Sequence, residues 1–262
     1  MIMKKFFFLA TLFACAAFLS SCGDDDEPVT PVTPTHSYVE IGGLRWSTMN
    51  LGATTVAGSP ATSYGDYYAW GETKPRYTSI VINGLNSVSF GGWMSEHGNG
   101  YADSDLPTYA GETLDAANDA ATVNWGSTWR TPSKDDFMNL TSACTGSTGN
   151  IDISPLSSSS PAGGIYWLSS TQTYLSDYIG VAGILFVDRT DTSKRLFFPA
   201  TGICFDTEMN YGGTLGYYWS SVRFPNMNPS SYQLYFSDLG VGPSNYYGIY
   251  YGCAIRPVSD IK

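Results

Sequence analysis

Short runs of apolar and aromatic residues recur through most of the chain and are bounded by Gly, Pro, Asn or Asp. Runs of this length, with this punctuation, predict β-strands rather than helices. The similar stretches YWLSS (166–170) and YWSS (218–221) are expected to lie on paired strands of one sheet. The predicted strands cover residues 38–41, 67–70, 165–169, 183–187, 195–198, 217–221, 232–237 and 250–257.

Two segments carry helix signals instead. Residues 114–123 contain two Ala pairs, and Ala has the highest helix propensity. A helix over 132–143 has a clear start: Thr131 is a capping residue, Pro132 suits the first turn, and Asp135 and Asp136 lie near the positive end of the helix dipole. Many short strands with two helices predict an α+β domain.

The first 21 residues have the pattern of a secretory signal. Lys4 and Lys5 precede a mostly apolar run over 6–19, which is shorter than the ~20 residues that a membrane-spanning helix needs. The following LSSC at 19–22 resembles the lipobox of bacterial lipoproteins, in which the cysteine receives diacylglycerol. This resemblance implies lipidation of Cys22 and attachment to a membrane through the lipid.

The segment after Cys22 is predicted to be a tether, over 22–37. Its GDDDE stretch at 23–27 resembles the acidic signal that sends Bacteroidetes lipoproteins to the outer face of the outer membrane. The PVTPVTPT stretch at 28–35 favours extended polyproline II backbone, which cannot bury a core. The organisation is therefore a signal peptide (1–21), a tether (22–37) and a folded body (38–262).

Charge and composition limit the function of that body. Cleavage of the signal leaves 11 basic and 23 acidic side chains, and the basic ones are scattered singly. A nucleic-acid partner is therefore disfavoured. The body is long enough for one substantial core, and the serine-rich 157–160 segment is predicted to be a loop within a single domain.

Six ordered blocks in the body resemble the Fibrobacter succinogenes major paralogous domain. The resemblance runs from Val39 to Val258 and implies the C-type lectin-like fold that this family shares with formylglycine-generating enzymes. It implies no activity, because the family is best known as cell-surface domains of undetermined role. The blocks are GLRWSTMNLGA (43–53), GDYYAWGET (65–73), NWGSTWRTPS (124–133), LFFPATG (196–202), GYYWSS (216–221) and AIRPV (254–258).

The sequence gives little support for a metal-binding site or for a nucleophilic catalytic site. His36 lies in the tether and His97 in a loop segment without a serine nucleophile motif, so neither a zinc cluster nor a serine hydrolase is expected. The FPN stretch at 224–226 lacks the glutamate of a lectin calcium loop. No cofactor is expected.

The remaining reactive groups are interpreted as structural. Three body cysteines are expected to be structural thiols, with their pairing left open: Cys144, Cys204 and Cys253. Asp115 with Asp119, and Asp135 with Asp136, are the candidate acid pairs for a glycoside hydrolase, but helix starts and solvation explain them better.

Aromatic and amide-rich segments at 90–93, 223–229 and 245–251 are the remaining surface candidates, because sugars stack on aromatic rings. Most tryptophans are assigned to the core instead: Trp46, Trp70, Trp125, Trp129, Trp167 and Trp219. The loop 223–231 is preferred as a ligand site. The predicted ligand-binding residues are Arg223, Asn226, Asn228, Tyr232 and Trp93.

The sequence thus predicts a lipid-anchored outer-membrane protein that presents a lectin-like domain to a glycan or a surface protein. Two alternatives remain open. One is an envelope hydrolase with an unrecognised acid pair. The other is a structural surface-layer or fimbria-associated component, which would expose a broad apolar patch or an unpaired edge strand.

Overall fold

The structure is a computed structural model that describes residues 36–76, 111–205, 208–225 and 229–261. Contacts divide the chain into two units, Met1–Pro31 and Val32–Lys262, and every described residue belongs to the second. Cys22, Trp93, His97, Asn226 and Asn228 lie outside the described residues. Within the described residues, no helix has the length and apolar character needed to cross a membrane.

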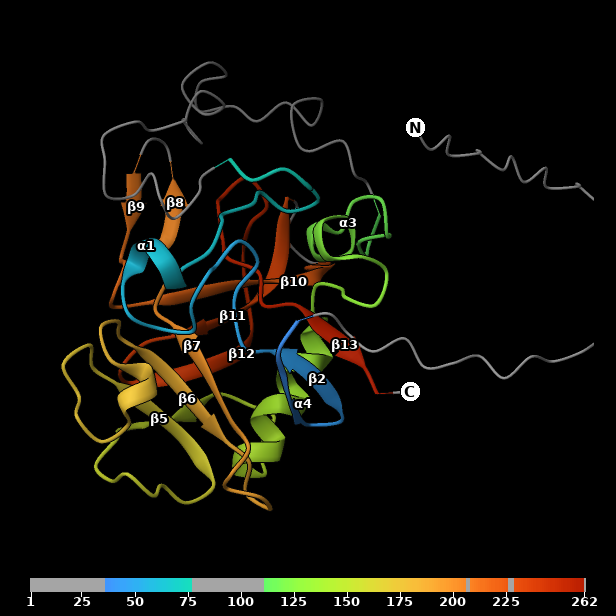
Figure 1. Ribbon diagram of the computed structural model, residues 1–262. Helices are drawn as coiled ribbons and strands as arrows, with labels where there is room; N and C mark the ends of the chain where they lie inside the picture. The colour runs from blue at the N-terminus through green and yellow to red at the C-terminus, as the bar shows by residue number, and fades with distance from the viewer. Residues whose placement is uncertain (1–35, 77–110, 206–207, 226–228, 262) are drawn as a thin grey trace, which may run out of the picture. The chain divides into compact units, whose positions relative to one another are not determined.

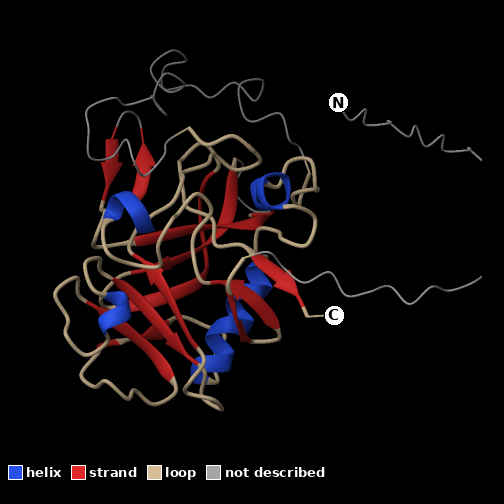
Figure 2. Ribbon diagram, in the orientation of Figure 1, coloured by secondary structure: helices blue, strands red, loops and turns tan. Residues whose placement is uncertain are grey.

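Strands dominate the described chain, and the helices are few and short (Figure 2). The strands are β1 (Tyr38–Ile41), β2 (Leu44–Ser47), β3 (Ile151–Asp152), β4 (Ser154–Pro155), β5 (Gly164–Leu168), β6 (Gly183–Val187), β7 (Arg195–Pro199), β8 (Ile203–Phe205), β9 (Glu208–Asn210), β10 (Gly216–Arg223), β11 (Ser230–Phe236), β12 (Gly240–Gly248) and β13 (Val258–Asp260). The helices are α1 (Pro60–Ser63), α3 (Ala120–Trp125), α4 (Lys134–Thr145) and the 3₁₀ turn η2 (Ser176–Tyr178).

These strands form several small sheets (Figure 1). The sheet orders are β1-β2-β13, β10-β11-β12-β3, β4-β5-β6-β7 and β8-β9. Neighbouring strands are antiparallel except for the short parallel pair of β4 and β5. The predicted α+β class is confirmed at this level.

The longest helix, α4, packs against strands of both four-stranded sheets. Its apolar side chains Phe137 and Leu140 are fully buried in the main core. Trp46, from β2, lies between the helix and a sheet, with its ring 5.6 Å from that of Phe137 and 6.1 Å from that of Phe198. The helix therefore holds the sheets around one aromatic core.

The predicted helix boundaries need correction. Residues 114–119 are not helical, because Oδ1 of Asp115 accepts hydrogen bonds from the backbone of Ala117 and Asn118 and holds a local turn. Helix α3 begins only after Asp119. Likewise α4 begins two residues later than predicted, capped by Ser133 rather than by Thr131. Pro132 therefore precedes the helix.

Some strand predictions were also wrong. Residues 67–70 and 250–257 form no regular strand, and single bridges such as that between Tyr68 and Cys253 join them instead. Conversely, β12 was missed because Gly240, Gly242, Pro243 and Gly248 interrupt its pattern. Its pairing with β11 shifts register around Pro243, which is where a strand tolerates a residue without N–H.

The expected pairing of the two similar aromatic stretches is not found. The first lies on β5 and the second on β10, and these strands belong to different sheets. Each pairs with the strand that follows it in sequence, β6 and β11 respectively. Each of these strands therefore pairs with its neighbour in sequence, as consecutive strands commonly do, and not with the strand that carries the similar stretch.

Several indole and phenol groups from the sequence blocks are turned inward, each donating to a backbone carbonyl. Nε1 of Trp70 donates to Ser220 at 2.7 Å, Nε1 of Trp219 to Tyr68 at 2.8 Å, and the Tyr67 hydroxyl to Thr201 at 2.6 Å. Four of the six predicted core tryptophans are fully buried: Trp46, Trp70, Trp129 and Trp219. Trp125 and Trp167 are partly exposed.

Candidate functional site

A pocket of about 610 Å³ lies beside β11 and β12 and the turn that follows β12. We call it the tyrosine pocket. Six of its lining residues are tyrosines, which come from β10, β11, β12 and the turn after β12. The lining residues are Tyr217, Pro229, Ser230, Gln233, Tyr235, Asn245, Tyr246, Tyr247, Gly248, Tyr250 and Tyr251.

Strand register explains how these side chains meet. Gln233 of β11 is opposite Asn245 of β12, so the two amide side chains project from the same face. Tyr217 of β10 is opposite Tyr235 of β11, and their rings are 5.2 Å apart in an edge-to-face arrangement. Tyr247 lies 5.9 Å from Tyr217, which extends the aromatic wall onto β12.

The aromatic wall continues into the turn after β12, where the ring of Tyr251 lies 4.5 Å from that of Tyr247 and 4.7 Å from that of Tyr250. Tyr246 and Tyr247 are 37% and 36% exposed, so their rings remain accessible. Burial raises the pKa of Tyr217, with nearby tyrosines adding to the shift. Its phenol is therefore neutral at physiological pH, and it offers a ring and a hydroxyl rather than a charge.

Gln233 gives the pocket its most informative polar group. The side chain is fully buried, and its Oε1 lies 3.9 Å from the thiol sulfur of Cys253, within range of a weak hydrogen bond. Its Nε2 is buried and has no hydrogen-bond partner among the described residues. A buried donor left without an acceptor costs about 1–3 kcal/mol, so a ligand oxygen that accepts from this nitrogen would recover that free energy.

The predicted site residues within the described chain lie next to this pocket rather than in it. The Arg223 guanidinium is 5.2 Å from the centre of the Trp70 ring. The Tyr232 ring is 5.1 Å from that of Phe224, and Lys134 lies over it. Phe224 in turn stacks on Tyr246 at 4.0 Å, so the predicted loop supports one wall of the pocket.

The predicted loop also contributes Pro229 and Ser230 directly to the pocket lining. Sequence reasoning identified the 245–251 segment as aromatic and amide-rich, but missed Gln233, Tyr217 and Tyr235. Nothing in the sequence around Gln233 signals its role, because that role depends on Cys253 and on tyrosines from neighbouring strands. A single amide within a strand is ordinarily a surface side chain.

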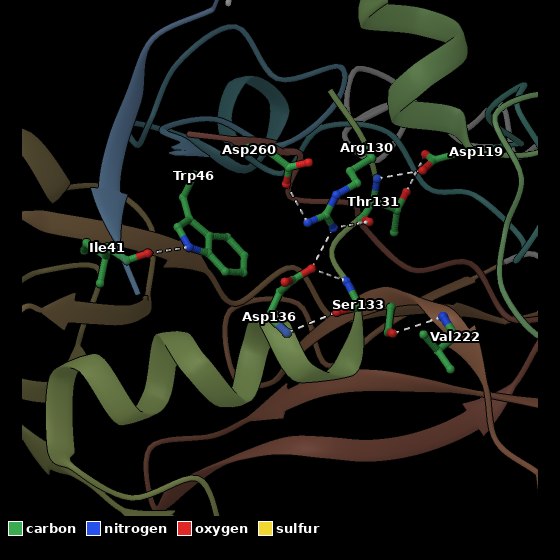
Figure 3. A network of polar contacts seen from close by, with 10 residues as sticks. Ile41, Trp46, Asp119, Arg130, Thr131, Ser133, Asp136, Val222 and Asp260 are labelled. Atoms are coloured by element: carbon green, nitrogen blue, oxygen red, sulfur yellow. Dashed lines mark hydrogen bonds and ion pairs between the residues drawn. The ribbon is translucent and has the colours of Figure 1, made fainter. Parts of the chain in front are cut away.

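One member of each candidate acid pair, Asp119 and Asp136, caps a helix and makes further polar contacts (Figure 3). Asp119 caps α3 and also accepts hydrogen bonds from the Thr131 backbone at 2.8 Å and the Thr131 hydroxyl at 2.7 Å. Asp136 closes the capping box of α4 with Ser133 and pairs with Arg130 at 2.6 Å. Arg130 also reaches Asp260 at the C-terminal strand, at 3.0 Å. These two carboxylates therefore stabilise the helix starts and the connections between elements.

The three cysteines of the body are free and buried: Cys144, Cys204 and Cys253. Burial raises the pKa of the Cys144 thiol to about 12 and raises those of the other two further, so thiolate nucleophiles are suppressed. Over the described residues, His, Cys, Asp and Glu side chains form no group of three or more that could hold a metal ion.

His36, which the sequence placed in the tether, contacts the folded body. Its ring stacks on Trp125 with centroids 3.8 Å apart and planes inclined by 16°, and it lies 5.9 Å from Trp129. Trp125 and Trp129 are themselves in edge contact at 5.5 Å. His36 therefore packs against the body through an aromatic contact at α3.

No protein-family model, curated protein or solved structure matches the chain.

Proposed function

We propose that this protein is a lipoprotein, anchored through Cys22 to the outer membrane and facing the exterior, whose folded body binds glycans in the tyrosine pocket. The anchoring part of the proposal rests on the signal sequence, the lipobox-like LSSC and the acidic and proline-rich tether. The binding part rests on the pocket itself. Fold alone would not support it.

The buried Nε2 of Gln233 is the observation that carries the binding proposal. A sugar presents hydroxyl oxygens that accept hydrogen bonds and an apolar ring face that packs on aromatic side chains. The pocket offers the matching groups: exposed rings at Tyr246 and Tyr247, and amides at Gln233 and Asn245. Pockets with an aromatic lining and a few placed polar groups are typical small-ligand sites.

The proposal includes a C-type lectin-like fold, supported by the six sequence blocks and by the mixed α+β architecture with short helices. It also includes binding that does not depend on calcium. The tyrosine pocket contains no carboxylate among its lining residues in the described chain, whereas calcium needs several hard oxygen ligands.

The experiment is a glycan array probed with residues 23–262, the mature chain without its lipidated cysteine, in calcium and in chelator. We expect binding that the chelator leaves unchanged. The double variant Tyr246→Ala/Tyr247→Ala should lose most of it, because removing stacked aromatic anchors costs roughly 2 kcal/mol or more in binding. Tyr174→Ala is the matched control, since Tyr174 is also exposed but does not line the tyrosine pocket.

Three results would contradict the proposal in different ways. Equal loss in the Tyr174→Ala control would show that the effect is not local to the pocket. Loss of glycan binding in chelator would show that binding needs a metal ion and does not depend on the tyrosine pocket alone. No binding to any glycan in either condition would contradict the glycan proposal. A surface protein would then be the ligand to seek.

A further inference from the structure

A second pocket, of about 480 Å³, adjoins the tyrosine pocket. The two pockets share Tyr235, Asn245 and Tyr246 as lining residues. Along β12, the second pocket extends from Gly240 to the shared residues, and the tyrosine pocket continues from there to Gly248. We call the two neighbouring pockets together the β12 groove. At ~3.3 Å per residue, the strand that runs along it is roughly 26 Å long.

The two parts of the groove differ in chemistry. The tyrosine pocket is aromatic, whereas the second pocket has polar side chains at 150, 152, 237 and 244. This second pocket lies where β3 pairs with β12. Leu239, which is 76% exposed, adds an apolar surface at the far end. One end therefore suits a stacked ring held by the Gln233 amide, and the other suits hydroxyl-rich units held by hydrogen bonds.

The charge in the groove restricts its ligand. Asp152 is the one Asp, Glu, Lys or Arg side chain among the described residues that line either pocket. No arginine or lysine in that lining could pair with a carboxylate or sulfate, and the whole chain has a formal net charge of −10. An acidic sugar chain would therefore lose its hydration near Asp152 without gaining a cation.

We infer that the β12 groove binds an uncharged, linear oligosaccharide several units long. One sugar ring lies in the tyrosine pocket against Gln233, and the following units run along β12 toward Asn150 and Asp152. This inference rests on the proposed function, and it adds the length and charge of the ligand. A groove of this kind binds several consecutive sugar units of an oligosaccharide rather than its terminal sugar alone.

The test is calorimetric titration of residues 23–262 with neutral β-1,4-linked gluco-, manno- and N-acetylglucosamine oligosaccharides of one to six units. Oligomannuronates of the same lengths, which share the β-1,4 linkage of the manno series and carry a carboxylate on each unit, serve as its acidic counterparts. We expect affinity for at least one neutral series to rise through the first several units and then level off. The acidic series should bind more weakly by up to about fivefold, and that difference should shrink with salt.

Two variants assign these effects to the groove. Asn150→Ala should weaken binding of the long neutral chains but not of the shortest that binds, because only the long chains reach it. Asp152→Lys should remove the discrimination against the acidic series. The control Asp177→Lys makes the same charge change on η2, away from both pockets, and should leave the discrimination unchanged.

The failures of the two proposals are distinguishable. If affinity is already maximal for a single unit, or if oligomannuronates bind as well as the neutral chains, the inference is overturned while the tyrosine pocket remains a glycan site. If no chain of any series binds, the inference is overturned as well. The array result with the Tyr246→Ala/Tyr247→Ala variant then decides separately whether the glycan function survives.

Discussion

Arg256 donates a hydrogen bond from Nε to Oδ1 of Asn50 at 2.8 Å, across 206 positions of sequence. Its Nη1 donates to the Ser47 carbonyl at 3.0 Å. Nδ2 of Asn50 donates to the Tyr218 hydroxyl at 3.1 Å, and that hydroxyl donates to the Pro199 carbonyl at 2.7 Å. Residues from four separate sequence blocks thus form one buried network.

The network holds a positive charge inside the protein. Arg256 is fully buried, with its guanidinium 4.4 Å from the centre of the Phe198 ring. Burial lowers the pKa of Arg256 to about 10, which is still above physiological pH, so the side chain remains charged. Among the described residues, oxygen acceptors and an aromatic face stabilise this charge, and no carboxylate pairs with it.

The first prediction is that Arg256→Lys destabilises the protein by about 2–4 kcal/mol. A lysine amine cannot donate along both guanidinium directions, so Asn50 or Ser47 would lose its donor in a buried site. Urea denaturation measures the change. The control Arg45→Lys removes an arginine whose ion pair with Glu40 is partly exposed, and it should cost less than about 1 kcal/mol. Equal costs would show that the network adds no particular stability.

Sequence reasoning succeeded where the local pattern determines the structure. The strand Gly183–Val187 was predicted with correct bounds, because an apolar run between turn residues leaves few alternatives. The pattern of β12 failed, since its glycines and proline are tolerated only through the irregular pairing with β11. The role of Gln233 was likewise hidden, because it depends on which side chains other strands bring to it.

The second prediction concerns Gln233→Leu, which should weaken glycan binding without destabilising the fold. Leucine removes the buried Nε2, which has no partner among the described residues, so the free energy of unfolding should stay within about 1 kcal/mol of the original or rise. Glycan binding should weaken, because the ligand can no longer accept a hydrogen bond from Nε2 of Gln233. Thermal unfolding and calorimetric titration measure the two effects. Parallel loss of stability and binding would indicate a structural role for the amide.

The third prediction is a depressed pKa for His36. Burial against Trp125 disfavours the charged ring and lowers the pKa of His36 below its ordinary 6.5. The unfolded chain then binds more protons than the folded one as pH falls below 6.5, so stability decreases through that window. NMR titration can follow the side chain directly, since the sequence has only two histidines.

Two variants make the histidine test specific. His97→Gln leaves His36 as the one histidine signal, and Trp125→Ala should return its pKa toward 6.5 by exposing the ring. Thermal unfolding of His36→Phe, which keeps an aromatic stack without a titrating group, should lack the decrease in stability below pH 6.5. An unchanged pKa in Trp125→Ala would rule out the stacking contact as the cause.

The fourth prediction is that no body cysteine reacts in the native protein. Residues 23–262 contain three thiols, all buried, and Cys144 has a pKa raised to about 12. Ellman's reagent should detect no thiol at pH 8 before denaturation and three after it. Ser158→Cys, at an exposed loop position, is the positive control. Fewer than three thiols after denaturation would reveal a disulfide and contradict this prediction.

The last prediction separates structural from catalytic carboxylates. Asp119→Ala removes the cap of α3 and two acceptors for Thr131, and we expect it to cost about 2–4 kcal/mol in the free energy of unfolding. Below its unfolding transition the variant should bind glycans normally, because Asp119 does not line the β12 groove. Denaturation and titration at one temperature measure both.

The control for this prediction is Asp135→Ala, which also removes a carboxylate near a helix start but from an exposed side chain. It should cost less than about 1 kcal/mol. A hydrolase would behave differently: glycan cleavage would be detectable in the original protein and abolished in a folded Asp119→Ala or Asp136→Ala variant. Such a result would assign these carboxylates to catalysis, whereas a loss of stability without any change in bound glycan assigns them to the fold.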